Sequence, residues 1–146
     1  MSVFIDTSAL YALLDEDDKH HAEASDALRR MVGQELVTHA FVVVESAALV
    51  GRRLPWPATE QLLGGILAIV EVAPVDDDLL ASALAAYRQS GSAGVSLVDR
   101  TSFAFMTHIG LSHRAAGKRT ASLPSAGGPT TTAPPLRCGC SGPFAV

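Results

Sequence analysis

Short apolar runs alternate with helical segments along the first 110 residues of the chain. The runs 2–5 and 35–38 are rich in strand-forming residues, and a third run, 69–73, mixes helical and strand character before Pro74 breaks it. Helices are predicted over residues 9–14, 20–32, 41–53, 59–70, 76–89 and 96–108. Short strands separated by helices are typical of an α/β fold with a parallel sheet, which is the predicted fold class.

Turn and cap residues mark where these elements begin and end. The first apolar run stops at Asp6, and the three polar residues from Asp6 to Ser8 all favour the start of a helix. Ser96 and Asp99 have the spacing of a capping box at the start of the 96–108 helix, which ends at Gly110. The first and the last predicted helix therefore each have an aspartate at or near the N-terminus.

The amino-acid composition of the chain changes after residue 110. The segment 111–146 contains five Gly and five Pro without helical or strand periodicity, so it is predicted to be an irregular, low-order tail. All fifteen acidic residues lie at or before Asp99, whereas residues 100–146 carry five basic residues and no acid. We expect a domain over 1–110 that is incomplete at its C-terminal end. We hypothesise that an altered reading frame produced the tail, in which case another frame of the gene encodes an acid-bearing strand and helix.

The composition limits the class of protein. With 146 residues, of which 48% are hydrophobic, the chain is expected to form one compact domain rather than a disordered polypeptide. It has no apolar stretch of membrane-spanning length and no basic and apolar leader after Met1, so a cytoplasmic protein without a membrane partner is expected. Cys138 and Cys140 are too few for a disulfide framework, and the sequence has neither a common zinc-binding spacing nor a phosphate-binding glycine loop.

Two acidic residues stand out by their positions. Asp6 follows a predicted strand, at the edge where open α/β sheets usually bind ligands, although an aspartate there can also serve only as a helix N-cap. Glu45 lies among apolar neighbours on its helix, where an unpaired carboxylate is costly, so a metal ion or a distant partner is expected beside it. The alternative for Glu45 is an ion pair with Arg52 or Arg53, or exposure at the rim of the protein.

Asp99 is the third candidate. Its simplest role is the acidic half of the capping box, but the same position places its carboxylate at the edge of the domain. Ser102 follows at i+3 on the same helix face, where its hydroxyl could hold a metal-bound water. The three acids come from separate elements that can converge on one site.

Three segments carrying these acids together resemble a known family. The segments VFIDTSAL (3–10), VESA (44–47) and SLVDRTSF (96–103) resemble the PIN-domain ribonucleases, and more narrowly the VapC-type toxins of bacterial toxin–antitoxin pairs. Their order and the separations of 39 and 54 residues between the acids fit the family pattern, and the resemblance covers about residues 1–110.

The resemblance implies an endoribonuclease that depends on Mg²⁺ or Mn²⁺. Asp6 and Asp99 would be direct metal ligands, and Glu45 would be a ligand through water or a water-orienting base. Ser8 and Ser102 would support the ion with their hydroxyls. Such carboxylates tolerate one another because a divalent cation neutralises them, and Mg²⁺ prefers oxygen ligands. The implied partners are an RNA substrate, a small cognate antitoxin and a second copy of the chain in a homodimer.

The segment after the third acid departs from the family pattern. The family usually adds a fourth acid from a strand soon after this helix, but residues 111–118 contain none. Its loss is expected to weaken or remove a second metal position, so the leading prediction is a metal-dependent ribonuclease that this loss could impair. The alternative is a catalytically inactive PIN-like module that binds an antitoxin or RNA without cutting it.

Overall fold

The computed structural model describes residues 2–91 and 94–111 of the chain. The elements are, in chain order, β1 (Ser2–Phe4), α1 (Thr7–Leu14), α2 (His21–Arg30), β2 (Glu35–His39), α3 (Ala40–Arg53), α4 (Trp56–Glu60), the π-helix η1 (Gln61–Ile66), β3 (Glu71–Ala73), α5 (Asp77–Ser90) and α6 (Leu97–His108). The predicted α/β class, with a short parallel sheet flanked by helices, is confirmed.

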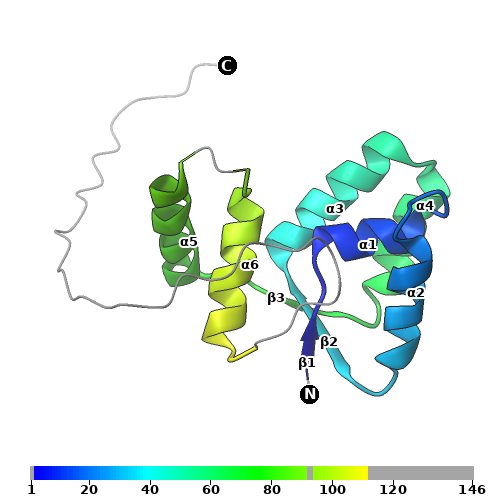
Figure 1. Ribbon diagram of the computed structural model, residues 1–146, viewed down its shortest axis with the longest axis horizontal. Helices are drawn as coiled ribbons and strands as arrows, with labels where there is room; N and C mark the ends of the chain where they lie inside the picture. The colour runs from blue at the N-terminus through cyan, green and yellow to red at the C-terminus, as the bar shows by residue number, and fades with distance from the viewer. Residues whose placement is uncertain (1, 92–93, 112–146) are drawn as a thin grey trace, which may run out of the picture.

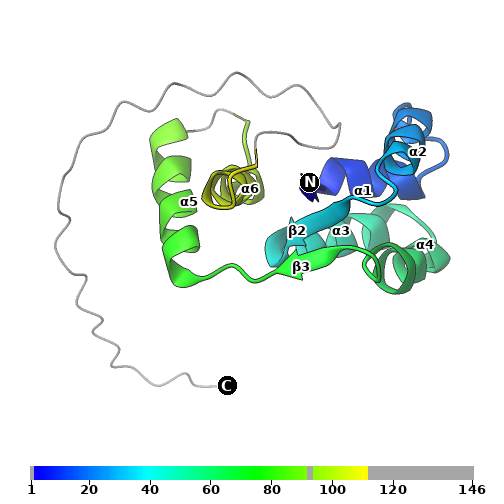
Figure 2. The same cartoon turned by 90° about the horizontal axis from the view of Figure 1, so that it is seen from below.

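The sheet follows the chain order. Its three strands are parallel and lie in the order β1-β2-β3, with Val3 opposite Leu36 and Val37 opposite Glu71. Both crossovers therefore run in the same direction and place their helices on the same face of the sheet. Figure 2 shows α1 to α4 on one side of the strands and α5 with α6 on the other.

The strands β1 and β2 are apolar and mostly buried, whereas Glu71 and Val72 of β3 are exposed. Phe4 and Ile5 of the first strand region are almost inaccessible to solvent, and Leu36 and Val37 of β2 are buried beside them. Leu10 of α1 and Phe105 of α6 pack against this layer from its two sides. The core is thus centred on β1 and β2, the two strands that lead to the candidate site.

Aspartate side chains cap two of the helices, as the polar residues before each helix predict. Asp76 is the N-cap of α5, and its Oδ1 accepts a hydrogen bond of 2.8 Å from the backbone N–H of Leu79. Replacing Asp76 with Ala is expected to lower the free energy of unfolding by about 1 kcal/mol, because that N–H loses its partner. Replacing it with Asn should leave the free energy near the wild-type value, since Asn caps equally well. Urea denaturation of both variants measures the difference, and equal losses would contradict the capping argument.

The predicted helix over 59–70 differs from the structure at both ends. Helical structure already begins at Trp56, since Pro57 lies in the first turn, where a missing N–H costs no intrahelical hydrogen bond. It continues as the π-helix η1 and ends at Ile66, so the predicted C-terminal end at residue 70 was wrong. The glycines 64 and 65 lie within η1, where their low helix propensity favours a departure from regular α-helix.

The predicted tail, residues 111–146, lies outside the described residues except at its first position. Leu111 packs against the hydrophobic core, and its N–H donates to the carbonyl of Met106 at 2.8 Å. Within the described ranges, no helix has the length and hydropathy needed to cross a bilayer.

Candidate functional site

The candidate acids lie on or next to elements that meet at one edge of the sheet. Because β1, β2 and β3 are parallel, their carboxyl ends lie at the same edge. Asp6 comes two residues after β1, and His39 is the last residue of β2, immediately before α3. Figure 1 shows the first turns of α1 and α3 side by side at this edge, with α6 next to them.

Asp6 is held at this edge by its own helix. It is the N-cap of α1, and its Oδ1 accepts hydrogen bonds of 2.9 Å from the N–H of Ala9 and from the hydroxyl of Ser8. The residue is buried, with 5% of its surface exposed. The capping alternative is therefore observed, and the Ser8 hydroxyl donates to the same carboxylate.

Glu45 is bound to the first turn of α1. The hydroxyl of Thr7 donates a hydrogen bond to Glu45 Oε2, and this bond joins two residues separated by 38 positions in the chain. Glu45 is half-buried on α3. Its partner is thus the residue that directly follows Asp6, which brings the first two predicted acids to neighbouring positions.

The ion-pair alternative for Glu45 is not observed. Within residues 2–91 and 94–111, the ion pairs join Glu23 to His20 and Asp26 to Arg29. The guanidinium of Arg53 instead lies 5.9 Å from the centre of the Tyr11 ring, a cation–π arrangement. A pairing of Glu45 with Arg52 or Arg53, one of the alternatives for this residue, is therefore not among the observed ion pairs.

Asp99 forms the predicted capping box of α6. Its Oδ2 accepts hydrogen bonds from the backbone N–H and the hydroxyl of Ser96, at 3.1 and 3.0 Å. The N–H of Asp99 in turn donates to Ser96 Oγ at 3.0 Å. The capping geometry fixes this carboxylate at the N-terminal end of α6.

Ser102 makes its hydrogen bonds inside the protein. Only 1% of its surface is exposed. Its hydroxyl donates to the carbonyl of Val98 at 2.9 Å, and its Oγ also lies 2.9 Å from Nε2 of His39. Ser102 therefore contacts the end of β2 and its own helix, and its hydrogen bond to His39 forms a polar link between β2 and α6.

The three acids do not form a ready-made metal cluster. Over the described ranges, no group of three His, Cys, Asp or Glu side chains is arranged to hold a metal ion. Ser8 donates a hydrogen bond to Asp6 and Thr7 donates one to Glu45, whereas Asp99 accepts from Ser96. Residues 112–118, where the family pattern would supply a fourth acid, lie outside the described residues.

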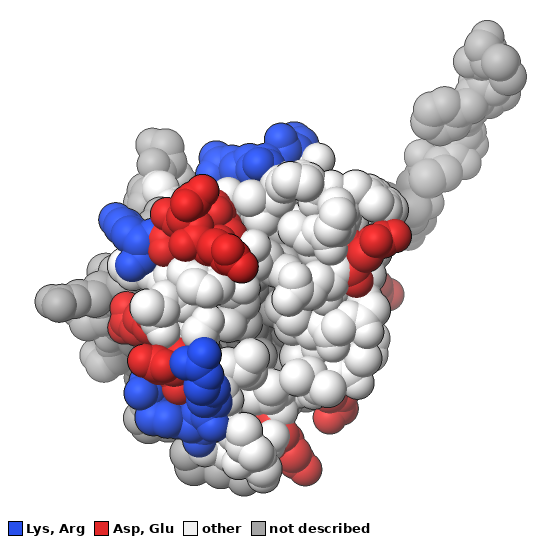
Figure 3. Space-filling model, turned by 90° about the vertical axis from the view of Figure 1, so that its right-hand side faces the viewer, with Lys and Arg blue, Asp and Glu red and all other residues white. Residues whose placement is uncertain are grey.

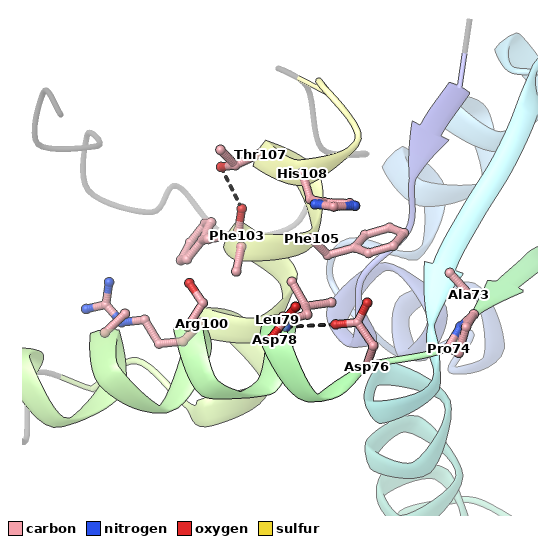
Figure 4. Close-up of a pocket in the computed structure, with 13 residues that line it drawn as sticks. Ala73, Pro74, Asp76, Asp78, Leu79, Arg100, Phe103, Phe105, Thr107 and His108 are labelled. Carbon is pink, nitrogen blue, oxygen red and sulfur yellow. Dashed lines mark hydrogen bonds between the residues drawn. The ribbon is translucent and has the colours of Figure 1, made fainter. Parts of the chain in front are cut away.

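A groove lies between α6 and α5. It has a volume of about 680 Å³, and Figure 4 shows Leu79, Phe103 and Thr107 among the residues that line it. Asp76 also points into it while capping α5. Since none of the three candidate acids lines this groove, it is separate from the site at the strand ends.

The described part of the chain is strongly acidic. It contains all fifteen acidic residues of the sequence but only seven of the eleven Lys and Arg residues. On the face drawn in Figure 3, basic and acidic side chains form separate small groups rather than one continuous basic surface. A polyanion would be repelled at long range by this charge unless bound cations reduce it.

Thr7 and His39 were not identified from the sequence as parts of the site. The polar pattern marked Thr7 only as a residue that favours a helix start, because its distant partner Glu45 could not be read from spacing. His39 was considered only for zinc-binding spacing. A usable signal existed, since His39 ends an apolar strand at the same edge as Asp6, where a buried polar side chain needs a specific partner.

Comparison with known proteins gives two similarities. Residues 3–119 match the family model described as PIN domain. The structure resembles the crystal structure of VapC20 from Mycobacterium tuberculosis, described as a sarcin–ricin loop cleaving toxin, with a TM-score of 0.73 and 26% sequence identity. The similarity covers 80% of this chain and 89% of that chain. No curated protein matches the sequence.

Proposed function

Because the chain belongs to the PIN-domain family, we propose that it is a divalent-metal-dependent endoribonuclease that acts as the toxin of a toxin–antitoxin pair. The hydrogen bond between Thr7 and Glu45 carries the proposal, because it joins the helix start beside Asp6 to the second acid at the ligand-binding edge of the sheet. The similarity to VapC20, described as a toxin that cleaves the sarcin–ricin loop, supports RNA as the substrate.

The donor atoms at this edge fit a hard divalent cation. Carboxylate and hydroxyl oxygens are the ligands that Mg²⁺ prefers, and Mn²⁺ accepts the same set. In our proposal Asp6 and Asp99 bind the ion directly, while Glu45 binds through water or orients the attacking water. A cation held there would supply water activation and compensation of charge on the phosphate.

The hydroxyl groups around the acids have a positioning role in this proposal. Ser8 and the N–H of Ala9 fix the Asp6 carboxylate, so that little reorganisation is needed to present it to the ion. Thr7 holds Glu45 in one orientation, from which it can accept a proton from the attacking water. Ser102 does not contact the ion in this proposal. Its hydrogen bond to His39 instead holds α6 against the end of β2.

The test is RNA cleavage by the full chain. A sarcin–ricin loop hairpin and an unstructured oligonucleotide would be incubated with Mg²⁺ or Mn²⁺, with EDTA as the metal-free control. We expect cleavage at defined positions that EDTA abolishes, and a large loss of rate in Glu45→Gln. RNA that stays intact with both metal ions would contradict the ribonuclease proposal.

A second candidate is the inactive PIN-like module. It is favoured by the lack of any acid after Asp99 and by the absence of a preformed three-acid group in the described ranges. In this case RNA or a small antitoxin binds to the chain, but RNA remains intact when Mn²⁺ is added. A binding titration run beside the cleavage assay separates the two candidates.

The remaining assignments are part of the same proposal. We propose a cytoplasmic protein, a small cognate antitoxin as inhibitor and a homodimer as the assembly, with a domain over 1–110 and a tail over 111–146. The reading-frame origin of the tail stays a hypothesis. Sedimentation of the chain, alone and with the product of the adjacent gene, measures the proposed assembly.

A further inference from the structure

His39 is a buried polar residue among aromatic rings. It has no exposed surface, and its ring centre lies 5.6 Å from that of Phe4, 6.2 Å from that of Phe41 and 5.7 Å from that of Phe105. Burial lowers the pKa of His39 to about 4, so the ring is neutral near pH 7. A phenyl ring would suit such surroundings better than an imidazole, so the presence of a polar ring at this position requires an explanation.

The hydrogen bonds fix the tautomer of this ring. The single hydroxyl proton of Ser102 is directed to the carbonyl of Val98, so Ser102 Oγ acts as the acceptor toward His39. His39 must then carry its proton on Nε2 and donate to Ser102. Its Nδ1 is left as a buried acceptor without a hydrogen-bond partner, which is unfavourable for folding.

His39 contacts all three elements that carry the candidate acids. It precedes α3, which carries Glu45, and its ring packs against Phe4, two residues before Asp6. Through Nε2 it reaches Ser102, one turn after Asp99 on α6. This hydrogen bond connects residues separated by 63 positions in the chain.

We propose that His39 is a positioning residue whose hydrogen bond to Ser102 sets the first turn of α6, and with it Asp99, against the strand edge that carries Asp6. This inference rests on the proposed metal site and adds the group that aligns its third acid. The aromatic surroundings support it, since a residue selected only for packing among these rings would be apolar. Groups that hydrogen-bond directly to metal ligands typically change metal affinity 10–100-fold when removed, and we expect a change in this range for a residue that acts through Ser102.

Three substitutions of His39 separate positioning from packing. His39→Gln keeps an N–H donor near the place of Nε2, whereas His39→Asn is too short to reach Ser102. His39→Phe fills the aromatic space but removes the donor. We expect His39→Phe to melt at the wild-type temperature or above it, and yet to bind Mn²⁺ about 10–100-fold more weakly in a titration of the metal-free chain. His39→Asn should show the same weakening, and His39→Gln should bind nearly as wild type does.

Ser102→Ala provides the matching change on the other side of the bond. It should weaken Mn²⁺ binding to the same extent, and combining it with His39→Phe should add no further loss, because both substitutions remove one interaction. Ser102→Ala also keeps the test decisive where a substitution of His39 fails to fold. Independent, additive effects of the two substitutions would contradict the proposal.

Amide hydrogen exchange gives a readout that needs neither metal nor RNA. In the metal-free chain, the N–H groups of the first turn of α6 should exchange faster in His39→Phe and Ser102→Ala than in wild type or His39→Gln. Unchanged exchange together with wild-type Mn²⁺ affinity in His39→Phe would overturn the positioning role. If wild type binds no Mn²⁺, the proposed metal site fails, and the exchange pattern alone decides whether His39 sets the position of α6.

Discussion

Replacing Asp6 with Asn is expected to lower the rate of RNA cleavage by about 10²–10³-fold, the loss typical for removal of a preorganised electrostatic group. Asn caps a helix as well as Asp does, so the hydrogen bond from the N–H of Ala9 and the stability of α1 should be retained. The variant therefore removes the negative charge of the side chain and retains the helix cap. Single-turnover cleavage at saturating Mn²⁺, with the melting temperature measured beside it, gives the comparison.

Asp76→Asn is the matched control for this variant. Asp76 also follows a parallel strand, caps a helix and accepts a backbone N–H, but it lies beside the groove between α5 and α6 rather than with the candidate acids. The same chemical change there should leave cleavage at the wild-type rate. Equal losses in the two variants, or full activity in Asp6→Asn, would show that the Asp6 carboxylate has no special part in catalysis.

The sequence predicted the parts of the fold that local chemistry determines. The turn at Asp6 and the capping box of Ser96 with Asp99 were correct because each depends on residues three positions apart. The helix predicted over 59–70 extends past the end of η1 at Ile66. Apolar composition does not show where a regular helical hydrogen-bond pattern changes. Local signals therefore located the elements and two of the candidate acids.

The interactions that join the elements could not be predicted in the same way. The bond from Thr7 to Glu45 spans 38 residues and that from His39 to Ser102 spans 63, so each depends on the strand order and on the face that each helix occupies. The sequence did identify Glu45 as a carboxylate in need of a partner. It could not distinguish a hydroxyl on α1 from an arginine on the same helix, because several partners were chemically acceptable. The metal-binding roles of the acids stay a prediction.

His39 is expected to make the folded protein sensitive to acid. Its pKa is lowered by burial from 6.5 to about 4 in the folded chain, whereas the unfolded chain keeps the ordinary value. Between these two pH values the unfolded state binds a proton that the folded state does not. The free energy of unfolding contributed by this residue is therefore fully present above pH 6.5 and falls as the pH drops toward 4, by about 3 kcal/mol in all.

His39→Gln isolates this contribution from the carboxylates that titrate in the same range. Gln can keep the donor to Ser102 but does not titrate, so its unfolding free energy should fall less steeply than that of wild type between pH 6.5 and 4. Urea denaturation at several pH values in this window measures both curves. Parallel curves would mean that His39 takes up its proton as readily in the folded protein as in the unfolded chain, which is incompatible with a neutral imidazole enclosed by Phe4, Phe41 and Phe105.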